Sequence, residues 1–198
     1  MADAAPTEVA PGDAAEAALA FLTEMSPDLR GAAILDSVGS VLAAAEDPER
    51  WAEDAAALFG AADGAGGEPV EQIHVATEQG EVFALRHAGF VAIAVTERFA
   101  LASLAFFDLR ATLRDLALQL GRPLMPPKPH RVLLDRVSGY ADEAAAYMRR
   151  RRVSRRPFAR LYYPSGRSSD QADDSTVGAE LFVAAGRLIE VAGKRAKA

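Results

Sequence analysis

The chain has 198 residues, half of them hydrophobic and a quarter charged, which is the balance of a soluble globular protein. It contains no cysteine and only three histidines, which excludes disulfides, thiolate metal sites and cysteine nucleophiles and argues against a structural zinc site. The net charge of -6 argues against nucleic-acid binding by the chain as a whole. The charge is unevenly distributed, because residues 122–160 carry eleven basic and three acidic residues, whereas residues 1–121 carry six and twenty.

The N-terminal residues 1–13 are small, acidic and interrupted by two prolines, which predicts a disordered tail. They lack the basic start and the apolar centre of a signal peptide. The sequence also has no apolar run near the ~20 residues that a membrane-spanning helix needs. We therefore expect a cytoplasmic protein without a membrane span.

The next segment is expected to fold as helix, hairpin and helix. The first helix is predicted to begin at Asp13, as the capping residue, and to end before Pro27. Two apolar runs flank residues 36–40 and predict a β-hairpin, in which Gly39 adopts a positive φ. Asp47, followed by a proline, marks the start of the second helix. The apolar stripe of that helix consists of Trp51, Ala55, Leu58, Phe59 and Ala62.

Three strands and a helix are predicted after a glycine-rich connection at residues 60–67. The period of two in residues 73–77, followed by runs at 82–85 and 90–95, indicates an antiparallel meander. The last run is apolar at every position, so we expect it to be central and covered on both faces. A long amphipathic helix follows and ends at Gly121.

These elements predict an α+β fold, in which helices flank a five-stranded antiparallel sheet over residues 14–121. Residues 122–131 form a proline-rich linker. Residues 132–198 are expected to be a basic, mostly helical C-terminal extension, with an aromatic patch and a polar loop before its last helix. The apolar stripe of the last helix consists of Leu181, Phe182, Ala185, Leu188, Ile189 and Ala192.

The sequence offers no convincing catalytic constellation. Residues 60–67 lack the Gly-Lys-Ser/Thr ending of a phosphate-binding loop and follow a helix instead of a strand. His74 and His87 lie in one predicted hairpin and would form a metal site with Glu78 or Glu81. We favour the alternative that both histidines are polar side chains on a half-exposed sheet.

The acidic residues of the first two helices, Asp54 among them, fall at solvated positions. No catalytic, cofactor-binding or metal-binding residue is therefore predicted, and we expect a protein that is not an enzyme. An enzymatic function is kept as a minor hypothesis, which a ligand or metal retained by the purified protein would favour.

The order of these elements, together with several short motifs, resembles the Roadblock (dynein light chain) domain family. The motifs are Gly31-Ala-Ala-Ile-Leu-Asp36, Gly39-Ser-Val-Leu-Ala43, Ala55-Ala-Ala-Leu58, the meander from Ile73 to Val95, and the helix containing Leu109-Arg110 and Leu113-Arg114. They cover about residues 14–121. Val38 stands where the family often has an acidic or polar residue.

The resemblance implies a homodimer in which the second helices pair and the third strands join edge to edge. Carried over to this chain, the paired helix would contribute Trp51, Ala55, Leu58 and Phe59, and the joining strand Ile73, Val75 and Thr77. Family members are mostly scaffolds or regulators of NTPases, and bacterial members bind small Ras-like GTPases on the helical face of the dimer. The resemblance thus implies a non-enzymatic homodimeric regulator or adaptor of a small GTPase.

An alternative function rests on the basic segment formed by Arg149, Arg150, Arg151, Arg152, Arg155 and Arg156. Six arginines in eight residues would neutralise several phosphates, and nearby aromatic side chains would stack on bases. This pattern predicts binding to nucleic acid or to another anionic surface. We prefer charge matching with the acidic residues 1–121 or with a partner protein, because the chain as a whole is acidic.

Overall fold

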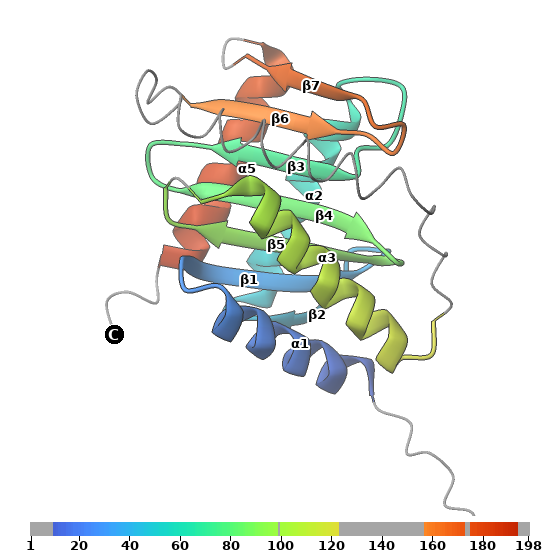
Figure 1. The fold of residues 1–198 in the computed structure, drawn as a ribbon. Coiled ribbons are helices and arrows are strands. Elements are labelled where there is room, and N and C mark those ends of the chain that lie inside the picture. Colours follow the sequence, from blue (N-terminus) through green and yellow to red (C-terminus); the bar gives the residue numbers. More distant parts are fainter. Residues whose placement is uncertain (1–9, 99, 123–156, 173–174, 194–198) are drawn as a thin grey trace, which may run out of the picture.

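The computed structural model describes residues 10–98, 100–122, 157–172 and 175–193. Its described strands form a single antiparallel sheet in the order β2-β1-β5-β4-β3-β6-β7 (Figure 1). The strands are β1 (Leu29–Asp36), β2 (Val41–Ala44), β3 (Gln72–Ala76), β4 (Glu81–His87), β5 (Phe90–Thr96), β6 (Phe158–Tyr162) and β7 (Ser168–Gln171).

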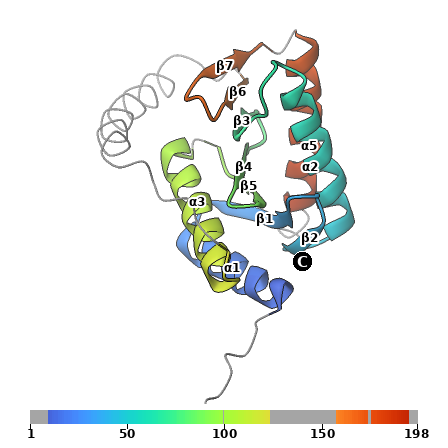
Figure 2. The same cartoon turned by 90° about the vertical axis from the view of Figure 1, so that its right-hand side faces the viewer.

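Helices cover both faces of the sheet, which gives three layers (Figure 2). One face carries α1 (Pro11–Met25) and α3 (Ala102–Gln119), and the other carries α2 (Pro48–Asp63) and α5 (Thr176–Gly193). A separate cluster of buried apolar side chains fills the space on each side of the sheet. Within the described ranges, no helix has both the length and the hydropathy needed to cross a bilayer.

The structure confirms the α+β class and the expected order of elements up to residue 121. β1 and β2 form the predicted hairpin, and Gly39 in its turn has a φ of +92°. The Asp36 carboxylate accepts hydrogen bonds from the amides of Val38 and Ser40, both at 2.9 Å, and thereby holds this turn. β5 lies inside the sheet between β1 and β4, and its side chains are buried on both faces, as its uninterrupted apolar run predicts.

Two predicted boundaries differ from the observed ones. α1 begins at Pro11, so residues 11–13 belong to the helix and not to a tail. Proline suits the first helical position because its φ is already helical, so the helix starts two residues before Asp13. Asp13 therefore lies in the first turn and does not cap the helix. α2 continues through Gly60 to Asp63, so only the last half of the glycine-rich connection is a loop.

The sheet has seven described strands, where the sequence predicted five. Residues 158–171, expected to be an aromatic patch and a polar loop, form β6 and β7 instead. β6 pairs with the whole of β3, from Gln72 opposite Tyr162 to Ala76 opposite Phe158. The described part of the C-terminal extension therefore contains two strands that the sequence did not predict, together with its last helix, α5, which is confirmed. The expected helix before the arginine segment and that segment itself lie outside the described residues.

Candidate functional site: the α2–α5 face

The residues expected to join two copies are covered from within the chain. Trp51, Ala55, Leu58, Phe59, Ile73 and Val75 are all buried and belong to one apolar cluster with side chains of β6 and α5. α5 packs along α2, and β6 occupies the edge of β3 that does not face β4. In this arrangement, the surface that the resemblance assigns to a second copy lies inside one chain.

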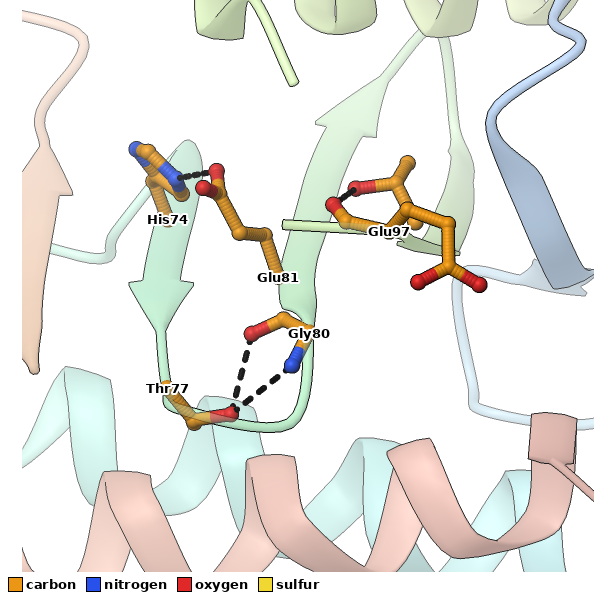
Figure 3. A network of polar contacts seen from close by, with 6 residues as sticks. His74, Thr77, Gly80, Glu81 and Glu97 are labelled. Atoms are coloured by element: carbon orange, nitrogen blue, oxygen red, sulfur yellow. Dashed lines mark hydrogen bonds and ion pairs between the residues drawn. The ribbon is translucent and has the colours of Figure 1, made fainter. Parts of the chain in front are cut away.

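Thr77, the last residue of the expected interface, has a local role. β3 ends at Ala76, so Thr77 lies in the turn that leads to β4. Its hydroxyl donates to the carbonyl oxygen of Gly80 at 2.9 Å and accepts from the amide of Gly80 (Figure 3). The same hydroxyl also accepts from the amide of Gln79. These bonds fix the turn and thereby the register of the β3–β4 hairpin.

A charged pair links the two helices of this face. Arg187 of α5 places Nη1 3.6 Å from Oδ1 of Asp54 on α2, and only 4% of Asp54 is exposed. Burial raises the pKa of the Asp54 carboxyl, while Arg187 and Arg50 act in the opposite direction. The expectation of a solvated position for Asp54 is wrong, because α5 lies over the side of α2 that carries it.

An open groove of about 320 Å³ runs between the two helices on their outer side. We define the α2–α5 face as the residues that line this groove: Ala57, Ala179, Glu180, Val183, Ala184 and Arg187. Val183 is 54% exposed, which makes it one of the large apolar side chains open to solvent. Gly60, one turn beyond Ala57, has open space where a Cβ would lie, so no side chain projects from α2 at this position. An apolar centre beside one acidic and one basic residue suits contact with another protein.

The residues of this face could not be selected from the sequence. The apolar stripe of α5 was predicted correctly, but it describes the buried side of the helix. Val183 and Arg187 lie outside that stripe, and they matter only because α5 pairs with α2. No local sequence pattern indicates that α5 packs against α2, because the two helices are more than a hundred residues apart in the chain.

His74 and Glu81 form a buried polar pair on the opposite side of the sheet. Their Nε2 and Oε2 atoms are 2.8 Å apart (Figure 3), and the imidazole stacks on Phe83 with a centroid distance of 4.4 Å. The expectation that His74 lies on a half-exposed surface is wrong, since only 2% of it is exposed. The pairing register of the β3–β4 hairpin accounts for this contact. Phe83 is the cross-strand partner of His74, and Glu81, two residues earlier on β4, therefore lies diagonal to His74.

The metal alternative finds no support in the part of the chain that the structure describes. His74 lies opposite Phe83, so His87 is four residues further along β4. No group of three or more His, Cys, Asp or Glu side chains able to hold a metal ion occurs among the described residues. Burial lowers the pKa of His87, and the nearby Arg110 lowers it further. The His74–Glu81 pair is therefore best understood as a satisfied polar contact within the core.

A second, smaller cavity of about 80 Å³ lies between the end of α1 and the start of α3. Its lining is mostly apolar and includes Met25, Leu104 and Asp108. Burial raises the pKa of the Asp108 carboxyl, and a hydrogen bond from the Ser26 hydroxyl at 3.2 Å partly opposes that effect. The volume is well below the roughly 300 Å³ at which ligand pockets usually begin, so it does not suit a cofactor.

The third candidate, the arginine segment from Arg149 to Arg156, lies outside the described residues, and anionic-surface binding through it stays a prediction. The α2–α5 face is thus the best-defined candidate surface in the described part of the chain. Comparison with known proteins adds no family to this description: no protein-family model matches the chain, and no curated protein has significant sequence similarity to it.

Proposed function

We propose that this protein is a cytoplasmic, non-enzymatic regulator or adaptor of a small Ras-like GTPase, and that the α2–α5 face binds the GTPase. The observation that carries the proposal is the pairing of α2 with a second helix on one face of the sheet. The Roadblock resemblance implies that the GTPase binds on the helical face of a dimer in which the second helices pair. Here α2 and α5 offer a two-helix surface of this kind within one chain.

The chemistry of the face supports contact with a folded protein. Its centre is the exposed Val183 above small side chains, and Glu180 and Arg187 lie beside it with opposite charges. Such a combination of an apolar centre and a polar rim is typical of interfaces between proteins. The homodimer is not carried into this proposal, because all the residues expected to join two copies, apart from Thr77, are buried inside the chain.

The test is nucleotide-dependent capture of a GTPase. The immobilised full chain is incubated with extract of the source organism, loaded with either a GTP analogue or GDP, and retained proteins are identified by mass spectrometry. We expect one small Ras-like GTPase to be retained preferentially in one nucleotide state. Its nucleotide exchange and hydrolysis rates are then measured with and without the full chain, to separate a regulator from an adaptor.

Variants of exposed residues locate the binding surface. Val183→Asp and Ala57→Glu place charge and bulk in the groove and should abolish capture while leaving the far-UV circular dichroism spectrum unchanged. Val38→Asp is the matched control, because Val38 is exposed in the β1–β2 turn, away from this face. The proposal fails if no GTPase is retained in either state, and the assigned surface fails if both groove variants capture the GTPase like the control.

A further inference from the structure

The C-terminal elements close an edge that the rest of the sheet would leave open. Without β6, β3 would be the last strand on that side, and its amides and carbonyls would face solvent. Ile73 and Val75 would lose their neighbours Leu161 and Ala159, which are buried with them on the side of α2. An exposed apolar edge strand of this kind is a template for pairing with another chain.

The same elements cover the apolar side of α2. Trp51 and Leu58 are fully buried in the cluster that includes Leu188 of α5. The approach is close enough that a Cβ on Gly31 would lie 2.9 Å from the Cβ of Ala192. Removal of α5 would therefore leave a contiguous apolar surface over α2 and the sheet beside it, and such surfaces favour association.

We propose that β6, β7 and α5 occupy the surface on which a second copy of the chain would otherwise pair, and so keep the protein monomeric. The occupant is part of the same chain, residues 157–172 and 175–193, which bring both a strand for the β3 edge and a helix for the α2 side. The new outer edge, β7, has the polar sequence Ser-Ser-Asp-Gln, which does not favour further pairing. This inference is independent of the proposed GTPase partner.

Covalent connection favours the occupant from the same chain over a second copy. Residues 123–156 join the two parts covalently, so their association is intramolecular and does not depend on the concentration of the chain. A second copy at micromolar concentration competes poorly with it. Hydrogen bonds beyond the strand pairing add to the contact: the Ser165 amide and hydroxyl both donate to the carboxylate of Glu68, at 3.1 Å each.

The absence of cysteine makes the β3–β6 contact directly testable in the full chain. Gln72 and Tyr162 are direct partners across the two strands, and both are partly exposed, so an oxidant reaches them. Cross-strand partners lie within the Cα separation that a disulfide requires. The full chain carrying Gln72→Cys and Tyr162→Cys is oxidised, analysed by non-reducing electrophoresis and peptide mapping, and compared with each single variant. Sedimentation equilibrium of the unmodified chain gives its mass in solution.

We expect a monomer across the micromolar range, a disulfide between positions 72 and 162 within one chain, and no disulfide-linked dimer from either single variant. A dimer linked between position 72 of one copy and position 162 of the other would overturn the proposal, since the strands would then be exchanged between copies. A dimeric unmodified chain, or a folded double variant that forms no disulfide between the two positions, would overturn it as well.

Displacing β6 and α5 from the rest of the sheet tests whether these elements prevent two copies of the chain from pairing. Leu161→Asp places a charge in the buried cluster between β6 and α2, and we expect the variant to form dimers whose population rises with concentration. Val183→Asp adds the same charge at an exposed position and should stay monomeric. If Leu161→Asp unfolds, Leu161→Ala is measured in its place. A folded variant that loses the protection of the β3 amides from hydrogen exchange and still remains monomeric would refute the pairing surface.

Discussion

The close approach of β1 and α5 at Gly31 gives a sharp prediction for a single methyl group. A Cβ at this position would lie 2.9 Å from the Cβ of Ala192, 3.3 Å from its Cα and 3.4 Å from Cζ2 of Trp51. Gly31→Ala therefore inserts a methyl group between the sheet and the last turns of α5. Two of its three neighbours belong to the helix, and the third is a buried indole, so none of them is the end of a flexible side chain.

The size of the effect follows from the distances. Carbon atoms in favourable contact are about 3.5–4.0 Å apart, so α5 must move by roughly 0.6–1 Å to accept the methyl group. Overpacking of this kind costs about 1–3 kcal/mol. Gly60→Ala is the matched control, because Gly60 is exposed within α2 and no heavy atom lies within 4 Å of its Cβ position. There, the gain in helix propensity should stabilise the protein by roughly 0.5–1 kcal/mol.

Urea denaturation followed by the fluorescence of Trp51, the only tryptophan, measures both variants. We expect the free energy of unfolding to fall for Gly31→Ala and to rise for Gly60→Ala. Ala192→Gly, made in both backgrounds, completes a double-mutant cycle, and it should cost less stability beside Gly31→Ala than in the original chain. If Gly31→Ala is as stable as the original chain, or the two substitutions are additive, β1 and α5 are not packed as described.

Three further variants test other contacts. Leu188→Ala, in the buried side of α5, should lower the free energy of unfolding by about 2–5 kcal/mol in urea denaturation, because it leaves a cavity beneath α2. Glu81→Ala removes the hydrogen-bond partner of the buried His74 and should cost roughly 1–3 kcal/mol by the same measurement, whereas the exposed Glu78→Ala should cost far less. Because burial raises the pKa of Asp54, the folded protein binds that proton more tightly than the unfolded chain, and stability is lost as pH rises through the range between the two pKa values. Asp54→Asn removes this loss, so the stability of the original chain minus that of the variant should decrease from pH 4 towards neutrality; a difference independent of pH would contradict the assignment.

The elements that the sequence predicted well are those fixed by neighbouring residues. The β1–β2 hairpin depends on Gly39 and Asp36 within its own turn, and the β4–β5 turn places Ala88 and Gly89 at positive φ. The long helix, α3, ends at Gln119, two residues before Gly121, which also has a positive φ. Each of these signals lies within a few residues of the element that it determines.

The elements that the sequence missed are fixed by distant residues. β7 contains no apolar side chain, so no alternating pattern reveals it, and it exists through its pairing with β6. β6 was interpreted as an aromatic patch because its strand character depends on β3, about eighty residues earlier. The apolar stripe of Trp51 and Leu58 correctly indicated a helix with a partner. The sequence did not indicate that the partner is α5 of the same chain. A helix that packs against its own chain and one that packs against a second copy have the same apolar pattern.

The long separation between β3 and β6 has a consequence for synthesis of the chain on the ribosome. At about 5–20 residues per second, β6 leaves the ribosome several seconds after β3, and α5 follows later still. During that interval α2 and β3 have already emerged, while the strand and the helix that cover them are not yet made. The nascent chain therefore passes through a state with an open strand edge and an uncovered apolar helix. This window is when neighbouring nascent chains on the same messenger, or a chaperone, would meet the surface that the finished protein hides.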